Sequence, residues 1–137
     1  MITTPSSPLK IYTDAAHSGN SVYAIGYVYC NHNGKPIGRQ ARQYGKCGIN
    51  KAEEEAMIEA LQNAPRQSRH AILRGDSLNS IEKLQSIQDG SVDSEKDREI
   101  KSLLDTFDYL SIEWIPREDN YLAHIEAARG AGKLSNI

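Results

Sequence analysis

Three acidic residues stand where a folded chain has little structural use for a charge. Asp14 lies inside the β-rich run "LKIYTDAA", although aspartate is depleted in strands. Asp76 ends the apolar stretch "AILRG", and Glu53 lies near the start of "KAEEEAMIEAL". If the three carboxylates converge, they repel one another unless a cation neutralises them. Oxygen-rich sites of this kind suit Mg²⁺ or Mn²⁺, and a two-metal arrangement serves phosphodiester hydrolysis.

Helical periodicity selects Glu53 from its three neighbouring glutamates. The residues three, four, seven and eight positions after Glu53 are all apolar, whereas the corresponding positions after Glu55 are mostly polar. We therefore expect Glu53 to face the core and Glu54 to lie at the boundary. A structural role is an alternative, because Asn50 is a good N-cap and Glu53 would then complete a capping box.

The positions of these acids depend on an alternating order of strands and helices. β-Branched and aromatic runs and 3.6-residue periodicity predict strands at 9–16, 21–30, 37–44, 70–77 and 109–116, and helices at 51–63, 78–87, from Ser94, and from Asp119 or Asn120. In the second helix we expect Leu78, Ile81 and Leu84 to face inward. The first three strands read as an antiparallel meander. If the first and fourth strands are neighbours, the three acids meet, in one α/β domain over residues 1–137 with a mixed sheet.

Composition excludes several classes of protein. The net charge of −2 argues against a nucleic-acid binder held by bulk charge, although a local strip of cations between residues 31 and 52 could either contact phosphates or be solvated. No apolar run is long enough to span a bilayer, and "MITTPSSPLK" lacks the features of a signal peptide. Cys30 and Cys47 match no zinc spacing, so we expect free thiols and a cytoplasmic protein.

Four motifs in order resemble ribonuclease H of type 1 and its retroelement relatives over nearly the full length. They are "IYTDAAHSGN", "NKAEEEAMIEAL", "RGDS" and "IEWIPREDNYLAHIEAA". Each motif alone is weak, but together and in this order they are a strong signal. The resemblance implies a ribonuclease H-like fold, with a five-stranded mixed sheet, three strands antiparallel and then parallel, flanked by helices. It assigns metal binding to Asp14, Glu53 and Asp76.

The fourth metal ligand departs from the family pattern. Four residues after Asn120, where the family usually has aspartate, this sequence has His124. Neutral imidazole is a competent ligand for Mn²⁺ and a poorer one for Mg²⁺. We expect a working Asp-Glu-Asp-His site, and the alternative is a degenerate site. The loop that often carries a proton-shuttling histidine in the family reads "PRED", which leaves Arg117 as a substitute at best.

The resemblance implies a metal-dependent endoribonuclease that hydrolyses the RNA strand of RNA/DNA hybrids and leaves 5′-phosphate and 3′-hydroxyl ends. Two Mg²⁺ or Mn²⁺ ions would serve as cofactors, and ligation by His124 would favour Mn²⁺. Asn20 and Asn50 would hold the hybrid, although Gly48 and Ile49 replace two polar residues of the family. We expect a monomer that binds no membrane. The alternative function is a catalytically inactive ribonuclease H-like module that binds nucleic acid.

Overall fold

A five-stranded mixed sheet forms the centre of the computed structural model, which describes residues 7–133. Two segments lie outside the described residues, 1–6 and 134–137. The first is part of the N-terminal stretch that we expect not to be a signal peptide. The strands have the spatial order β3-β2-β1-β4-β5, and their bounds are β1 Leu9–Gly19, β2 Val22–Cys30, β3 Pro36–Lys46, β4 His70–Gly75 and β5 Tyr109–Trp114. β3, β2 and β1 are antiparallel, whereas β1, β4 and β5 are parallel. The predicted five-stranded mixed sheet, with three strands antiparallel and then parallel, is therefore confirmed.

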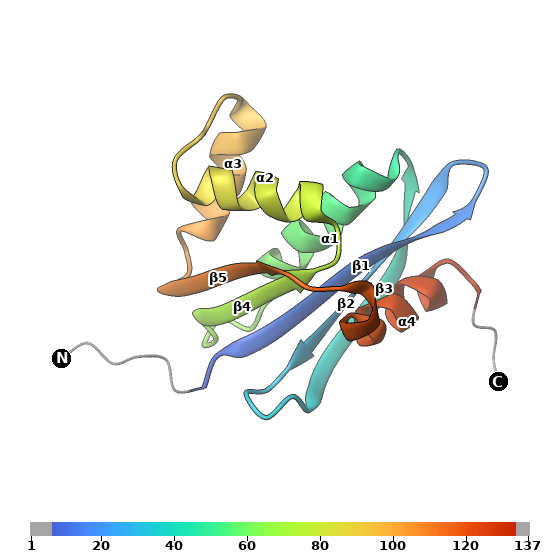
Figure 1. Cartoon of the computed structure of the whole chain (residues 1–137), viewed down its shortest axis with the longest axis horizontal. Helices are drawn as coiled ribbons and strands as arrows, with labels where there is room; N and C mark the ends of the chain where they lie inside the picture. Colours follow the sequence, from blue (N-terminus) through green and yellow to red (C-terminus); the bar gives the residue numbers. More distant parts are fainter. Residues whose placement is uncertain (1–6, 134–137) are drawn as a thin grey trace.

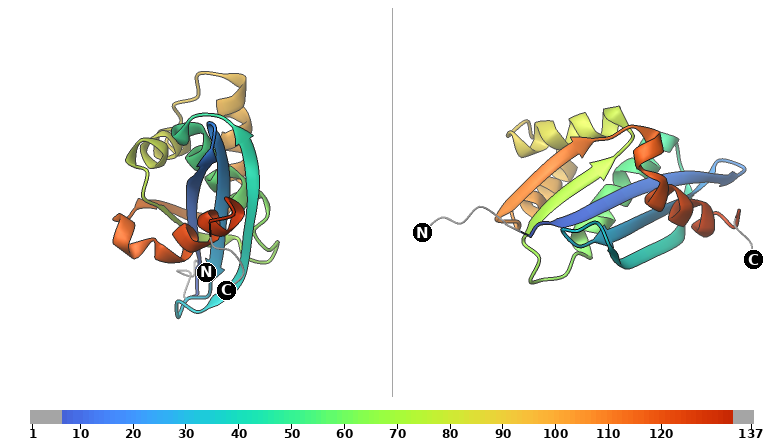
Figure 2. Two further views of the ribbon diagram at one scale, coloured as in Figure 1. Left: turned by 90° about the vertical axis from the view of Figure 1, so that its right-hand side faces the viewer. Right: turned by 60° about the horizontal axis from the view of Figure 1, so that its bottom comes forward.

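Helices cover both faces of this sheet (Figure 1). They are α1 Ile49–Gln62, α2 Leu78–Gln88, α3 Glu95–Leu104 and α4 Tyr121–Gly130, with a short 3₁₀ helix η1 at Arg117–Asp119. Side chains alternate between the two faces of β2. The Tyr27 hydroxyl reaches Glu59 of α1, and the neighbouring Gly26 faces Ala127 of α4. α1 and α4 therefore pack on opposite faces, as the two views of Figure 2 also show.

The main core fills the space between the sheet and α1, α2 and α3. It is built from apolar side chains of nearly every element, among them Ile11, Met57, Leu73, Ile81, Leu84, Ile100 and Ile112. In α3, Ile100 and Leu104 are buried, and Ser94, where the sequence predicts the helix to begin, caps it by accepting a hydrogen bond from the amide of Asp97. This core fixes α1 against β1, which is what carries Glu53 to the sheet.

The α4 helix lies unusually close to the sheet. A Cβ atom added to Gly26 would come within 2.6 Å of the Glu126 carbonyl carbon, and one added to Gly130 would come within 2.9 Å of the Arg42 nitrogen. The buried carboxylate of Glu126 is held at the same place by Arg39 and Arg129, at 3.5 and 3.6 Å. Glycine at these two contacts lets the backbones approach, and so brings α4 within reach of β1.

Two sequence-based expectations about helix positions are wrong. The N-cap of α1 is Gly48, with no side-chain cap, so Asn50 is an exposed residue of the first turn and forms no capping box with Glu53. Leu78 is the first residue of α2 and is 52% exposed instead of facing inward. The first error comes from placing the start of α1 by residue type alone, which is accurate only to a residue or two. α2 begins where it is predicted to begin, and only the direction of its first side chain is wrong.

Three further expectations concern the chain as a whole. Cys30 and Cys47 are both free, as expected. Within residues 7–133, no helix is both long and apolar enough to cross a bilayer. That residues 1–137 form a single domain stays a prediction.

Candidate metal centre

Three carboxylates from distant parts of the chain meet at one edge of the sheet. Asp14 comes from β1, Glu53 from α1 and Asp76 from the residue directly after β4. Each contributes an oxygen atom that lies within 4.8 Å of the other two. The convergence that the sequence predicts for these three residues is therefore present in the structure.

The parallel pairing of β1 with β4 produces this arrangement. The register pairs Tyr12 with Arg74, and the same offset carried two residues further places Asp14 beside Asp76. Neighbouring strands are about 4.8 Å apart, so carboxylates at matching positions are close. β4 ends at Gly75, and α1 crosses the space beyond it. The site thus lies beside the middle of β1 and beyond the carboxyl end of β4, and ligands of open α/β sheets bind at the carboxyl ends of strands.

Burial and mutual repulsion make these carboxylates hard to ionise. Asp14 and Glu53 are only 4% and 5% exposed. Burial raises the pKa of Glu53 to about 10, and the negative charge of Asp14 adds to this effect. The pKa of Asp14 is also raised, first by burial and then by Asp76, while the amide of Ala15 opposes the change. Without a cation, Glu53 keeps its proton at neutral pH and donates a hydrogen bond to Asp14.

The chemistry of the three residues fits a divalent metal ion. Hard cations such as Mg²⁺ and Mn²⁺ prefer carboxylate oxygens. The Oε2 atom of Glu53 is buried and has no hydrogen-bond partner among the described residues. A bound cation would supply both the missing partner and the missing positive charge. A purely structural role leaves that buried oxygen unexplained, so metal binding is the better interpretation of Glu53.

His124 lies next to the three carboxylates but not among them. Its Nδ1 atom is 3.3 Å from Oδ2 of Asp14, but it is not one of the three side chains whose ligand atoms all lie within 4.8 Å of one another. The imidazole side chain is 47% exposed, so it lies on the open side of α4 rather than on the alanine-rich face that packs on the sheet. His124 therefore lies beside Asp14 and is more exposed than the three acids, and its role as a fourth ligand stays a prediction.

Asn120 fixes the start of α4, and with it the position of His124. Its side chain is fully buried, and its Nδ2 atom donates to the carbonyl of Thr13 at 2.9 Å. Sequence reasoning proposes Asn120 as a helix cap, and it does precede α4, but its side chain caps no amide of that helix. It ties α4 instead to the residue directly before Asp14.

The carboxylates open into a cavity of about 320 Å³. Besides the three acids it is lined by Ala15, Ile49, Ser77 and Arg117. Ile49 is exposed and apolar, and Ser77 follows Asp76 directly. Helical or strand periodicity in the sequence does not identify these four residues as part of a site. For Ala15 and Ser77, the one signal in the sequence is that they directly follow Asp14 and Asp76.

The two asparagines assigned to the substrate lie on the surface beside the centre. Asn20 stands at the tip of the β1–β2 turn, where its positive φ of 52° gives the tight turn its shape. The next residue, Ser21, accepts a hydrogen bond from the amide of Cys47 at 3.1 Å, which brings this tip close to the start of α1. Asn50 is exposed there and lines a separate groove with Lys51, Glu54, Asn79, Ser80 and Lys83. Neither asparagine lines the carboxylate cavity.

The cationic strip seen in the sequence is largely neutralised. Arg39, Arg42 and Lys51 form ion pairs with Glu126, Glu59 and Glu55 respectively. Charges that already have carboxylate partners attract phosphates weakly. We therefore interpret the strip as a set of surface ion pairs and not as a surface that binds nucleic acid.

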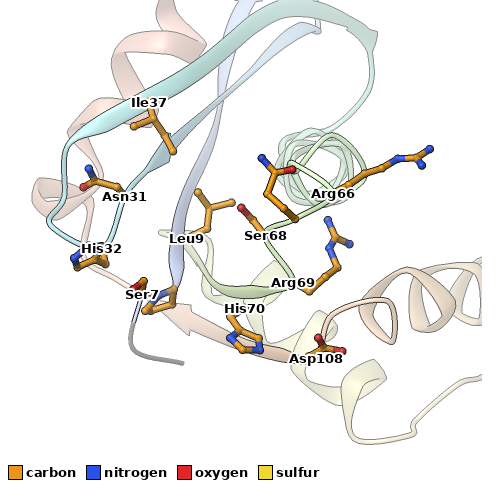
Figure 3. A pocket seen from close by; sticks show the side chains of 12 residues that line it. Ser7, Leu9, Asn31, His32, Ile37, Arg66, Ser68, Arg69, His70 and Asp108 are labelled. Carbon is orange, nitrogen blue, oxygen red and sulfur yellow. The ribbon is translucent and has the colours of Figure 1, made fainter. Parts of the chain in front are cut away.

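A second cavity, of about 490 Å³, lies at the opposite end of the sheet (Figure 3). It is lined by residues from the start of β1, the β2–β3 turn and the segment before β4, and it contains His32, His70 and a single acid, Asp108. The guanidinium group of Arg66 points away from its centre in Figure 3. No three-ligand cluster occurs there among residues 7–133.

The raised carboxylate pKa values predict that the metal-free protein loses stability as pH rises. The folded state keeps protons that the unfolded chain releases, so the free energy of unfolding falls from about pH 4.5 upward, towards the pKa of about 10 for Glu53. Thermal unfolding in EDTA should show a loss on the order of 2 kcal/mol between about pH 5 and pH 7.5. Added Mn²⁺ should remove most of that loss, and Glu53→Gln should show a shallower slope. Equal slopes for wild type and Glu53→Gln would contradict the assignment.

Comparisons with known proteins agree with this geometry. Residues 12–130 match the family model described as reverse transcriptase-like. No curated protein matches the sequence significantly. Among solved structures, the chain is similar to RNase H1 from the halophilic archaeon Halobacterium salinarum NRC-1, with a TM-score of 0.78 and 28% identity over 93% of this chain and 99% of that one.

Two more distant structures share the fold. The N-terminal RNase H domain of a Mycobacterium tuberculosis protein, solved as a fusion with maltose-binding protein, has a TM-score of 0.78 and 21% identity, over 93% of this chain and 95% of that one. LC11-RNase H1, solved in complex with an RNA/DNA hybrid, has a TM-score of 0.74 and 24% identity, over 91% and 97% of the two chains. At these identities the likeness concerns the fold alone.

Proposed function

Because the chain belongs to the reverse transcriptase-like family and has a ribonuclease H-like fold, we propose that it is a metal-dependent endoribonuclease acting on the RNA strand of RNA/DNA hybrids. The observation that carries this proposal is the buried cluster of Asp14, Glu53 and Asp76, in which each residue offers an oxygen to the same small space. Without cations, the repulsion between these carboxylates lowers the stability of the fold. With bound cations, the same residues form a centre that can catalyse phosphodiester hydrolysis.

Asp14, Glu53 and Asp76 would hold two Mg²⁺ or Mn²⁺ ions, with His124 as a fourth ligand. When bound, such ions activate a water molecule and stabilise the charge that develops on the leaving oxygen. Asp14 is central, because it contacts both Glu53 and His124. The Ala15 amide and the buried main chain of β1 orient its carboxylate before substrate arrives. The proposed products carry 5′-phosphate and 3′-hydroxyl ends.

Asn20 and Asn50 would hold the hybrid in its minor groove, where 2′-hydroxyl groups distinguish RNA from DNA. Their closeness at the β1–β2 turn and the start of α1 supports a shared surface. The α2–α3 connection is short and acidic and adds no cationic surface, so we expect weak hybrid binding. A monomer acting in the cytoplasm remains part of the proposal.

Cleavage of labelled nucleic acids tests the substrate class. Purified protein should cut the RNA strand of an RNA/DNA hybrid in Mg²⁺ or Mn²⁺ and leave single-stranded RNA, duplex RNA and duplex DNA of the same sequence largely intact. Cleavage of all four substrates would point to a broader nuclease. Cleavage of none would remove the enzymatic proposal.

An inactive binding module is the second candidate, because His124 is exposed and stands outside the tight carboxylate cluster. Isothermal titration with Mn²⁺ near neutral pH separates the two candidates. Ion binding by wild type that is lost in Glu53→Gln supports the enzyme. Absence of ion binding, together with retained hybrid binding, supports the module.

Replacing His124 by aspartate should shift the metal preference. A carboxylate is a better ligand for Mg²⁺ than imidazole, so the ratio of Mg²⁺- to Mn²⁺-supported cleavage should rise on the order of 10-fold in His124→Asp. An unchanged metal ratio would exclude His124 as a ligand.

A further inference from the structure

The last strand of the sheet, β5, has one long edge that faces no other strand. It is the outermost strand on its side of the sheet, and among residues 7–133 it pairs with β4 alone (Figure 1). In such an edge strand the main-chain groups of alternate residues point away from the sheet, where a strand of another molecule can pair with them. The outer edge of β5 is therefore a place where this chain could associate with other chains.

The residues of β5 make this edge prone to association. Its sequence, YLSIEW, is rich in residues of high β propensity and contains neither proline nor glycine. Its one charged residue, Glu113, is paired with Arg74 at 3.1 Å. The side chains of Tyr109 and Trp114, at the two ends of the strand, are 44% and 48% exposed. The strand is thus apolar, nearly uncharged and reachable from solvent at both ends.

The opposite edge strand, β3, carries the usual protection against pairing. It begins with Pro36, contains the cations Arg39, Arg42 and Lys46, and has two irregularities in its register with β2. Proline, like charges and bulges each discourage a further strand from adding to an edge. β5 has none of these features, because its register with β4 is regular and it contains no proline and no cation.

Two glutamines of α2 occupy the outward carbonyls of β5 instead. Nε2 of Gln85 donates to the carbonyl of Ile112 at 2.7 Å, and Nε2 of Gln88 donates to the carbonyl of Leu110 at 2.8 Å. Odd-numbered residues here face β4, as the bond from the amide of Ile115 to the end of that strand shows, so these two even-numbered carbonyls point away from it. Each side-chain amide therefore fills the position that an N–H group of an added strand would take.

The packing of α2 does not depend on these two hydrogen bonds. Ile81, Leu84 and Ile87 of this helix are buried in the main core. Burial of three large apolar side chains contributes more stability than two hydrogen bonds between neutral groups. Holding two glutamine side chains in one conformation also costs entropy. Their contribution to the position of α2 is therefore small, and their effect on the strand edge is the larger consequence.

We propose that Gln85 and Gln88 close the β5 edge and so prevent a second copy of this chain from adding its own β5 there. A second copy is the partner that fits, because two β5 strands can pair antiparallel about a two-fold axis at Ile112. Each copy then offers the same carbonyl and N–H groups to the other, and Leu110 of one copy lies opposite Trp114 of the other. This role does not rest on the proposed nuclease function.

The double variant Gln85→Met/Gln88→Met tests this role. Methionine resembles glutamine in length and helix propensity but has no N–H group to donate. We expect wild type to sediment as a monomer and the double variant to form a dimer, with a self-dissociation constant at least about 10-fold lower than that of wild type. The matched control is Gln62→Met, the same substitution at an exposed residue of α1, which should sediment like wild type.

Hydrogen exchange locates the association. In the double variant the amides of Leu110 and Ile112 should exchange more slowly as the protein concentration rises, whereas in wild type and Gln62→Met they should not respond to concentration. If the double variant fails to fold, Gln88→Met alone, which frees one carbonyl, is compared with Gln62→Met in the same way. A folded variant that stays monomeric, or a dimer that leaves these two amides unprotected, overturns the inference. A wild-type dimer paired through β5 overturns it as well.

Discussion

Asp14→Asn is expected to abolish hybrid cleavage, with a loss of at least about 10³-fold, and to make the metal-free protein more stable. Asp14 is buried, contacts Glu53 and His124, and is repelled by Asp76. Asparagine keeps the shape of the side chain but removes its charge. The rate falls because the metal loses a central ligand, and stability rises because a buried charge and its repulsion are gone. Cleavage assays and thermal unfolding in EDTA measure the two effects.

Opposite signs for rate and stability separate a functional carboxylate from a structural one. The control is Asp108→Asn, an exposed aspartate at the far cavity, which should alter neither quantity by much. A loss of activity accompanied by a loss of metal-free stability would mean that Asp14 supports the fold. That result would weaken the metal-site assignment even if the rate fell as expected.

Gly26→Ala is expected to destabilise the protein by about 3 kcal/mol, a large effect for one added methyl group. The new Cβ would lie 2.8 Å from the Cα of Ala127 and closer still to its nitrogen, which are backbone atoms of α4. Backbone cannot move aside as a side chain can, so α4 must shift away from β2. Because α4 carries His124, the variant should also cut hybrid more slowly. Chemical denaturation and cleavage rates test both consequences.

Gly38→Ala provides the matched control on the neighbouring strand. Its added Cβ would meet only the side chain of Tyr29, at the ordinary contact distance of 3.4 Å. Alanine otherwise suits a strand at least as well as glycine, so this change should be close to neutral. If Gly26→Ala had an equally small effect on stability and cleavage rate, the close contact between Gly26 and α4 would not be what fixes the position of His124.

The sequence predicts the carboxylate centre well because its information is local. The 3.6-residue period of α1 determines that Glu53 faces inward, Asp76 follows the end of β4, and the pairing of β1 with β4 places Asp14 beside it. The five strands follow from the same patterns, and the resemblance carried by the ordered motifs implies the mixed sheet. The structure adds the distances and the burial, which explain why these acids are under strain without a cation.

Other features depend on contacts between distant segments. Glu54, predicted at the boundary, is buried because α2 packs beside α1 and brings Lys83 within 2.6 Å of it. Leu78 is exposed because it is the first residue of α2, and the buried face of this helix begins only at Ser80 and Ile81. Asn120 looks like an ordinary helix cap until the structure shows its link to Thr13. No periodicity along the chain encodes such pairings.

The most direct test of the central claim is cleavage of a 5′-labelled RNA strand, annealed to DNA, by the purified chain with Mg²⁺, with Mn²⁺ and with EDTA. The account predicts cutting with at least one of the two ions, none with EDTA, and product ends that carry 5′-phosphate and 3′-hydroxyl groups. Cutting that continues in EDTA, or that leaves a 2′,3′-cyclic phosphate, would contradict a metal-dependent reaction at Asp14, Glu53 and Asp76.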